Sequence, residues 1–328
     1  MEYKHYIGVD VSKHTLDFTL LNGGDFLLHE RIKNSKADIR LLLKKMMTTY
    51  RAGGKRTLFC VECTGTYATV LIDELVRRKV PLWLESPLQI RLSLGLQRGK
   101  SDKLDSLRIA QYAYTYRNNR KLWNQPRLII EHLKQLRSLR ERLLVTYYQL
   151  RSETKETKGY IHQAITSSVL QHCQASLDAI TSDLANVNKT VLGVITADER
   201  LNQLYQWITS VGGVGNVLAT ELLITTNEFK NFTSPKKFAC HCGIAPFRYT
   251  SGTSTQSKAR VSKRANKRMK YLLHMAAMAA IRYEGDYKRY YERRTKQGLN
   301  RMSVLNAVRN KIVRRVFACV REQRFYIK

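Results

Sequence analysis

The stretch YIGVDV at residues 6–11 decides the fold, together with TLDFTLL at residues 15–21. Both stretches are short and mostly apolar, so each predicts a β-strand, and their closeness along the chain predicts that they pair. NGGD at residues 22–25 has the composition of a tight turn and leads into a third predicted strand at about 26–32. The chain therefore opens with three consecutive strands.

Helices and strands alternate over the rest of the first hundred residues. Apolar residues at helical spacing predict a helix over 36–50, TLFCVE at 57–62 predicts a fourth strand, and a helix follows at about 67–78. VPLWL at 80–84 predicts a fifth strand. This order is that of a ribonuclease H-like sheet, a mixed α/β layer fold, which we expect to occupy residues 1–126.

The apolar pattern changes after this first domain. Four residues recur every seven positions: Ile129, Leu136, Leu143 and Leu150. A second apolar set at 177–194 keeps the same three-four spacing, so residues 127–204 are predicted to form a coiled coil or a long helical hairpin. Two amphipathic helices packed on their own domain fit the pattern equally well. The remainder, residues 205–328, is predicted to be a mainly α-helical C-terminal domain.

The composition points to a polyanionic partner. The 328 residues include 57 Lys and Arg against 26 Asp and Glu, a formal charge of +31, and residues 251–328 alone hold 21 basic and 4 acidic residues. A compact protein with this surplus repels itself unless nucleic acid balances the charge. No apolar run approaches the length of a membrane span. Six cysteines and no signal-like N-terminus fit a reducing cytoplasm rather than a disulfide scaffold.

Carboxylates stand at the ends of two predicted strands. Asp10 and Glu62 each lie at the end of an apolar strand, and the first and fourth strands of such a sheet are neighbours. Asp102 and Asp105 are three residues apart on a predicted helix and share a face. Four converging carboxylates repel one another unless cations lie between them, as in sites that bind paired Mg²⁺ for attack on a phosphodiester. Taken singly, each has an alternative role as a turn cap, a helix cap or a solvated charge.

Further residues are candidates for nucleic-acid contact. A basic run contains Arg260, Lys263, Arg264, Lys267 and Arg268. This density of charge suits phosphate contacts, with a solvated helix face as the alternative. VGGVG at 211–215 fits a helix–hairpin–helix turn in which the backbone at Gly213 and Gly215 holds a phosphate, with a plain interhelical turn as the alternative. Lys100 is a further candidate beside the carboxylates.

Several motifs resemble one family. DVSK at 10–13, ECTGTY at 62–67 and KSDKLD at 100–105 closely resemble the three acidic motifs of DEDD transposases, which belong to bacterial insertion sequences and are related to the Piv DNA invertases. The N-terminal domain of that family is similar to the RuvC resolvase. Three C-terminal stretches also match the family: GIAP at 243–246, SGTS at 251–254 and VSKRANKR at 261–268.

The resemblance implies a two-part DNA recombinase. Mg²⁺ would be held by Asp10, Glu62, Asp102 and Asp105, and Ser251 would attack the DNA phosphate to form a transient phosphoserine bond. From the residues alone Ser251 is an ordinary serine of a polar loop. The resemblance also implies a bridge RNA that pairs with donor and target DNA. Because recombination needs several strand cuts in register, we expect a homodimer or homotetramer.

Two other functions compete with recombination. A RuvC-like structure-specific endonuclease would use the same carboxylates with water as the nucleophile and would need neither Ser251 nor RNA. A non-catalytic nucleic-acid-binding protein is the third possibility. The four carboxylates argue against it, because acidic groups near a phosphate weaken simple binding.

Overall fold

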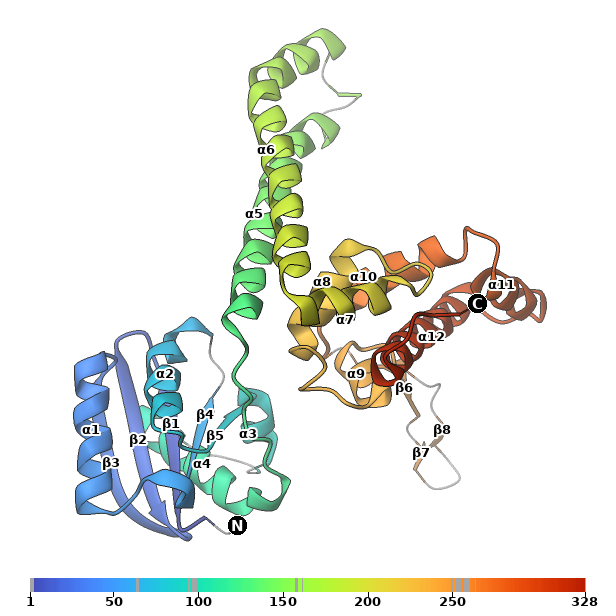
Figure 1. Ribbon diagram of the computed structural model, residues 1–328. Helices are drawn as coiled ribbons and strands as arrows, with labels where there is room; N and C mark the ends of the chain where they lie inside the picture. The colour runs from blue at the N-terminus through green and yellow to red at the C-terminus, as the bar shows by residue number, and fades with distance from the viewer. Residues whose placement is uncertain are drawn as a thin grey trace. The chain divides into compact units, whose positions relative to one another are not determined.

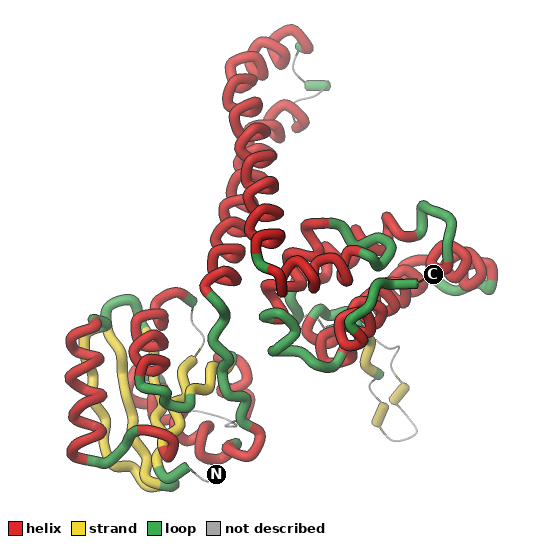
Figure 2. Tube along the Cα trace, in the orientation of Figure 1, coloured by secondary structure: helices red, strands yellow, loops and turns green. Residues whose placement is uncertain are grey.

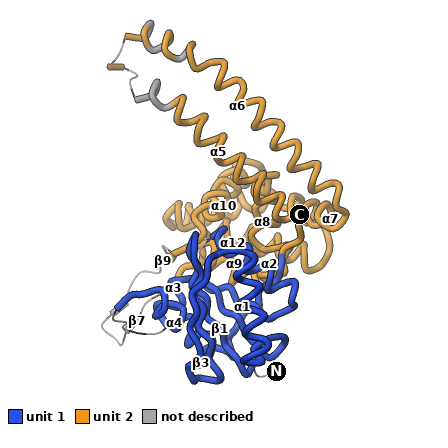
Figure 3. The backbone as a smooth tube through the Cα atoms, turned by 90° about the vertical axis from the view of Figure 1, so that its left-hand side faces the viewer, with its two compact units in different colours: residues 1–125 blue, residues 126–328 orange. Residues whose placement is uncertain are grey.

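The structure is a computed structural model that describes residues 3–62, 65–93, 95, 99–156, 159–160, 162–248, 250–251, 255–256, 260–262 and 264–327. The chain divides into two compact units, residues 1–125 and residues 126–328, which are coloured separately in Figure 3. Each unit has a hydrophobic core of its own. No helix among the described residues is both long enough and apolar enough to cross a membrane.

The first unit is built on a five-stranded mixed sheet in the order β3-β2-β1-β4-β5, drawn as arrows in Figure 1. Its strands are β1 (His5–Val11), β2 (Thr15–Asn22), β3 (Asp25–Lys33), β4 (Thr57–Glu62) and β5 (Leu82–Glu85). The first three strands are antiparallel neighbours, whereas β4 runs parallel to β1 and β5 runs parallel to β4. The predicted mixed α/β sheet is therefore confirmed.

Helices cover both faces of this sheet. They are α1 (Lys36–Thr49), α2 (Thr69–Arg77), α3 (Pro87–Ser93) and α4 (Asp102–Thr115), with short 3₁₀ turns at Gly54–Arg56, Thr66–Ala68 and Arg117–Asn119. Side chains alternate along β1, so Ile7 and Val9 pack with α1 and α2 on one face, and Tyr6 packs with α4 on the other. Asp10 has the same parity as Tyr6 and therefore belongs to the α4 face.

The second unit is mainly helical, as predicted, and Figure 2 shows its long helices in red. Helices α5 (Leu128–Glu156) and α6 (Gln163–Ala197) lie side by side as a hairpin within one chain. Ile129, Leu136 and Leu143 of the first heptad set pack against the core of this same unit. The predicted coiled coil is not confirmed by this packing and stays a prediction.

The rest of the second unit is a cluster of shorter helices around a common core. They are α7 (Glu199–Thr209), α8 (Asn216–Thr226), α9 (Pro235–His241), α10 (Lys267–Ala280), α11 (Asp286–Lys296) and α12 (Arg301–Glu322). Two pairs of two-residue strands complete the unit: β6 (Pro246–Phe247) with β9 (Arg260–Val261), and β7 (Thr250–Ser251) with β8 (Thr255–Gln256).

Candidate active site

A row of acidic residues crosses the sheet at one level. Asp10 of β1 is the cross-strand partner of Asp17 on β2, and Glu62 of β4 is the partner of Glu85 on β5. The parallel pairing of Val9 with Val61 brings Asp10 and Glu62, one residue further on, to neighbouring positions. Asp10 and Glu62 thus lie on adjacent strands, as the sequence predicted. Asp17 and Glu85 were not predicted to belong to this row.

Helix α4 brings the other two carboxylates over this row. It crosses β1 so closely at Gly8 that a side chain there would overlap the backbone of Ala110 and Ser106. A buried hydrogen bond of 2.8 Å between the hydroxyls of Ser106 and Thr19 ties the helix to β2. The first turn of α4 contains both Asp102 and Asp105. The close packing at Gly8 is therefore what sets the height of these two residues above Asp10.

The four predicted carboxylates lie within electrostatic reach of one another. Burial raises the pKa of Asp10 above its ordinary value, and the charges of Asp105, Asp102 and Asp17 act in the same direction. Burial also raises the pKa of Glu62. The charges of Asp10 and Asp105 add to that increase, and the charge of Lys100 opposes it. Mutual repulsion of this kind is relieved when a cation binds between the carboxylates.

Two arginines already compensate part of this negative charge, and a histidine ring contacts one of the carboxylates. Arg31 of β3 forms an ion pair of 3.0 Å with Asp102 and lies 3.6 Å from Asp17. The ring of His29 lies 3.0 Å from Asp17, and Arg108 pairs with Asp105 at 2.9 Å. Within the described part of the chain, no three acidic, histidine or cysteine residues are grouped closely enough to hold a metal ion. Asp102 and Asp105 are held by guanidinium groups instead.

A cleft of about 420 Å³ opens beside the carboxylates within the first unit. Glu62 and Asp105 line it together with three basic residues, Arg91, Lys100 and Arg108. A cleft that combines carboxylate oxygens with cations suits a phosphodiester, because cations attract the phosphate while the carboxylates can hold a hard metal ion. Lys100, a predicted nucleic-acid contact, thus lies at this cleft.

Ser251 lies in the second unit. Its backbone belongs to β7, where it pairs with Thr255 of β8. Lys263 and the serine side chains of this loop lie outside the described residues. Arg260 is exposed on β9, Arg264 is exposed in the segment before α10, and Lys267 is exposed as the first residue of α10. Their predicted contact with nucleic acid stays a prediction.

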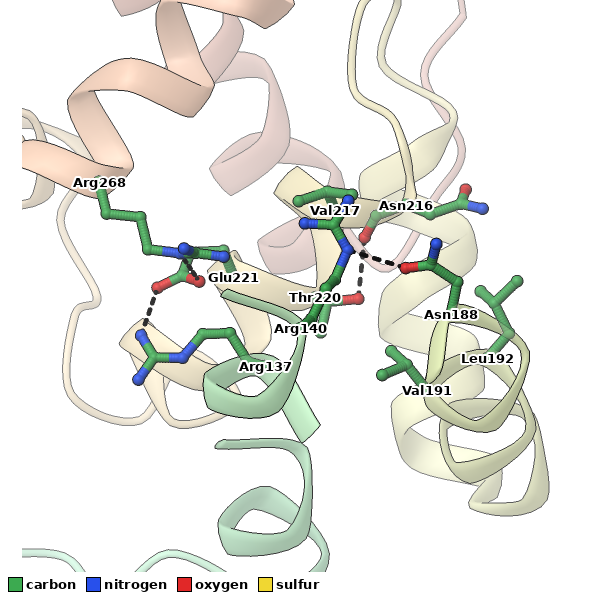
Figure 4. Close-up of a pocket in the computed structure, with 10 residues that line it drawn as sticks. All are labelled: Arg137, Arg140, Asn188, Val191, Leu192, Asn216, Val217, Thr220, Glu221 and Arg268. Carbon is green, nitrogen blue, oxygen red and sulfur yellow. Dashed lines mark hydrogen bonds and ion pairs between the residues drawn. The ribbon is translucent and has the colours of Figure 1, made fainter. Parts of the chain in front are cut away.

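Arg268 differs from its neighbours because it is already paired. Its guanidinium lies 2.7 Å from the buried Glu221 of α8 and also pairs with Glu141 of α5. Arg137 of α5 contacts the same Glu221 at 3.2 Å, and Figure 4 shows these side chains at a pocket of about 170 Å³. Arg268 therefore fastens α10 to α8 and α5.

The glycine-rich turn joins α7 to α8. Gly213 has φ +87°, and a side chain there would meet the carbonyl oxygen of Ala276 at 2.5 Å and the Cβ of Ala280 at 2.7 Å, both on α10. Glycine is thus required at this position for close packing of the turn on α10. The phosphate-binding role predicted for Gly213 and Gly215 stays a prediction.

Two transposase families match the chain. Residues 7–157 match a DEDD transposase domain of the IS110 type, described as a transposase, and residues 205–292 match the family described as "Transposase IS116/IS110/IS902 family". Among solved structures, Thermus thermophilus RuvC in complex with a Holliday junction substrate is similar at 14% identity, with a TM-score of 0.31. The alignment covers 37% of this chain and all of RuvC.

Two curated proteins of insertion elements are also similar. One is the uncharacterised 44.8 kDa protein of IS116 from Streptomyces clavuligerus, 28% identical over 119 residues, which are 36% of this chain and 30% of that protein. The other is the uncharacterised 43.6 kDa protein of IS110 from Streptomyces coelicolor, 27% identical over 119 residues, or 36% of this chain and 29% of that protein. The chain thus matches less than a third of each relative's length. The chain is therefore similar to transposases of the IS110/IS116 insertion sequences over residues 7–157 and 205–292.

Proposed function

We propose that this chain is a DNA recombinase that cuts and rejoins donor and target DNA for its insertion sequence. The observation that carries the proposal is that Asp10, Glu62, Asp102 and Asp105 lie within electrostatic reach of one another, with two of them lining a cleft that also holds basic residues, inside a domain that matches transposases. A protein that only binds nucleic acid gains nothing from carboxylates that repel the approaching phosphate.

The donor set of this site fits Mg²⁺. All four side chains offer hard oxygen atoms, and the pKa values of Asp10 and Glu62 are raised by burial first and by the neighbouring carboxylates second, so a bound cation would stabilise their charged forms. Bound Mg²⁺ would supply Lewis acidity toward the scissile phosphate. Asp102 and Asp105 would take part once Arg31 and Arg108 release them.

Ser251 is the nucleophile that we propose. Its hydroxyl oxygen bonds to the phosphorus of the scissile phosphodiester while the phosphorus–oxygen bond to the neighbouring nucleotide breaks. The serine hydroxyl gives up its proton and the departing oxygen takes up one proton to become a free hydroxyl, so protons balance, and the phosphate stays on serine as a phosphoserine ester. One ester replaces another, so the strands can be rejoined without an outside energy source.

Partners and assembly extend the proposal. The exposed Arg260, Arg264 and Lys267, with Lys263, would contact the nucleic-acid backbone, and a bridge RNA would select donor and target DNA by base pairing. A homodimer or homotetramer would make the strand cuts together. The division of the second unit into a helical segment, 127–204, and a C-terminal domain, 205–328, is part of the same proposal.

The experiment that tests this mechanism follows DNA strands through denaturation. The full chain is incubated with Mg²⁺, the RNA transcribed from the element's ends and labelled DNA that carries those ends. Wild-type protein should retain a DNA strand on a denaturing gel, and Ser251→Ala should neither retain it nor cleave, because the attacking atom is gone. Ser257→Ala, in the same polar loop, is the matched control and should behave as wild type.

A water-using endonuclease gives the opposite result. Ser251→Ala would then cleave at the wild-type rate, and neither protein would carry a DNA adduct. That outcome would overturn the recombinase mechanism while the carboxylate site stayed in place.

A further inference from the structure

A basic groove runs along α12 between α9 and α11. Two hollows, of about 500 Å³ and about 480 Å³, share Tyr290 and Lys311 in their walls and so lie next to each other. Lys236 of α9 and Arg314 of α12 line the first hollow, and Arg293 of α11 lines the second. We call the two hollows together the α12 groove. It lies wholly within the second unit.

The charges of the α12 groove are poorly balanced. Among the described residues that line the groove, six are basic and one, Asp286, is acidic. Asp286 is already shared by Arg289 at 2.7 Å and Arg315 at 3.1 Å. Four cations therefore have no carboxylate partner within the described part of the chain: Lys236, Arg293, Lys311 and Arg314. Unbalanced cations around a groove favour a ligand with regularly spaced negative charges.

An aromatic ring lies among these cations. Tyr290 is half-buried against the core of the second unit, which fixes its position. The Nζ atom of Lys311 lies 4.4 Å from the centre of its ring, and the Cζ atom of Arg293 lies 5.9 Å from it. Aromatic rings beside cations are the usual elements of sites for single-stranded nucleic acid, in which bases stack and phosphates pair.

The wall of the groove also offers hydrogen-bond acceptors. Asn306 and Asn310 both donate their Nδ2 hydrogens to the carbonyl oxygen of Ile244, at 2.8 Å and 2.9 Å. Their Oδ1 atoms accept no hydrogen bond from any residue that the structure describes, and the hydroxyl-bearing Ser303 lies in the same wall. A DNA backbone has acceptors alone, whereas each ribose of RNA carries a 2′-hydroxyl that can donate.

We propose that the α12 groove binds the sugar–phosphate backbone of a single-stranded RNA segment, with Lys311 and Arg314 on phosphates and the asparagine Oδ1 atoms on 2′-hydroxyls. This inference rests on the proposed function, to which it adds the surface that holds an RNA strand. The observation that carries it is the juxtaposition of cations that have no carboxylate partner among the described residues, a half-buried tyrosine ring and two asparagine Oδ1 atoms with no donor among those residues.

The test measures binding by fluorescence anisotropy with the full chain in EDTA, so that no strand is cut. The probes are a labelled oligouridine of about 20 nucleotides and the oligodeoxyuridine of the same length. Wild-type protein should bind the RNA probe at least about threefold more tightly than the DNA probe. The double variant Lys311→Glu/Arg314→Glu should weaken RNA binding by about tenfold or more, and its salt slope should fall by about 0.7 for each lost phosphate contact.

A matched variant separates the groove from overall charge. Lys237→Glu/Lys296→Glu changes the net charge equally at two exposed lysines that do not line the groove, and it should weaken RNA binding by less than about threefold. If the charge reversals impair folding by circular dichroism, Lys311→Gln/Arg314→Gln replaces them. If both double variants lose the same amount of RNA affinity, the α12 groove is not the binding site. If wild-type protein binds the RNA and DNA probes equally tightly, the groove does not select RNA.

Cleavage distinguishes failure of this inference from failure of the proposed function. If the α12 groove does not bind RNA, Lys311→Glu/Arg314→Glu should keep both the RNA affinity and the Mg²⁺-dependent DNA cleavage of wild-type protein. A wrong proposed function would instead leave the RNA affinity of wild-type protein intact in EDTA, while no DNA cleavage appeared with Mg²⁺.

Discussion

At the scale of single residues, Arg31 balances part of the negative charge of the acidic row. It lies on β3 as the cross-strand partner of Asp17, and its guanidinium also reaches Asp102 on α4. A single exposed cation thus does in this structure what a metal ion would do between these carboxylates. Arg31 and a metal ion therefore compete for Asp102.

This competition makes Arg31→Ala informative. Removing the guanidinium should raise the affinity for Mg²⁺ by about fivefold, equivalent to about 1 kcal/mol of lost competition. It should lower the stability of the metal-free first unit by less than about 1 kcal/mol, since the side chain is exposed. Calorimetric titration with Mg²⁺ and thermal unfolding measure the two effects, with Arg31→Lys as the charge-conserving control. Weaker Mg²⁺ binding by Arg31→Ala would mean that Arg31 does not compete for the site.

Gly8 determines how close α4 comes to Asp10. In Gly8→Ala the new methyl group overlaps backbone atoms of Ser106 and Ala110, which cannot move without shifting the helix. We expect a loss of about 2–3 kcal/mol in the unfolding free energy of the first unit, measured by urea denaturation. Gly193→Ala is the control, because nothing lies near its Cβ position in α6 and the change should stabilise that helix by about 0.5–1 kcal/mol. Unchanged stability of Gly8→Ala would contradict this packing.

Residue identity predicted half of the acidic row. Asp10 and Glu62 could be singled out because each ends an apolar strand, where a carboxylate has no packing role. Asp17 gave no such signal, since acidic residues are ordinary on alternating strands. Glu85 ends the apolar strand β5 as Glu62 ends β4, so the same signal could have singled it out. Arg31 belongs to the row only through the register of β3 on β2, and sequence periodicity does not specify register to one residue.

The junctions of the helical unit depend on buried ion pairs at the element scale. Arg127, just before α5, bonds Asp198 at 2.7 Å and Glu228 at 2.9 Å. Asp198 also caps α7, and Glu228 is one of three successive residues with positive φ, Asn227, Glu228 and Phe229. One side chain thus fixes the start of α5, the start of α7 and the strained turn that follows α8.

Arg127→Met should therefore destabilise the second unit by about 2 kcal/mol at neutral pH, because Glu228 would keep its burial and lose its main partner. The hydrogen bond from Arg127 lowers the pKa of Asp198. At Glu228, burial acts to raise the pKa, but the hydrogen bonds and charges of Arg127 and Lys230 outweigh it, so the pKa of Glu228 is lowered as well. Lowered pKa values stabilise the fold above about pH 4, so the difference between variant and wild type should shrink as the pH falls further.

Arg200→Met is the matched control for this prediction. Arg200 contacts the same Glu228 at 2.9 Å but is more exposed, so its loss should cost less than about 1 kcal/mol. Urea unfolding at pH 7 and pH 3 measures both variants. A pH-independent loss in Arg127→Met would show that packing, rather than charge, is responsible.

Elements were more predictable than their junctions. Periodicity predicted the strands of the sheet and the long helices of the second unit. It gave no sign of the left-handed residues after α8, because their conformation depends on Arg127, about a hundred residues earlier in the chain. Arg140 interrupts the heptads as a polar residue, and its Nε donates to Asn188 of α6 at 2.9 Å, a pairing that sequence alone does not identify.

Charge is the dominant property of the whole molecule. More than half of the formal charge of +31 lies after residue 250, together with the exposed Arg264 and Lys267 and most basic residues of the α12 groove, whereas the four candidate carboxylates lie in the first unit. This separation of charge is what we expect if the proposed function is right, because phosphate contacts need cations and metal binding needs carboxylates. Composition predicts nucleic-acid binding, and the two acidic strand ends predict where the chemistry lies; both stay predictions.

We propose above all that Asp10, Glu62, Asp102 and Asp105 hold the metal ion that DNA cleavage requires. The most direct measurement is the rate of Mg²⁺-dependent cleavage of a plasmid that carries the whole element, by the full chain with its RNA. Asp10→Asn should lower this rate by orders of magnitude with no loss of DNA binding, and Asp25→Asn, an exposed acid on β3, should leave it unchanged. Cleavage by Asp10→Asn at the wild-type rate would contradict the account.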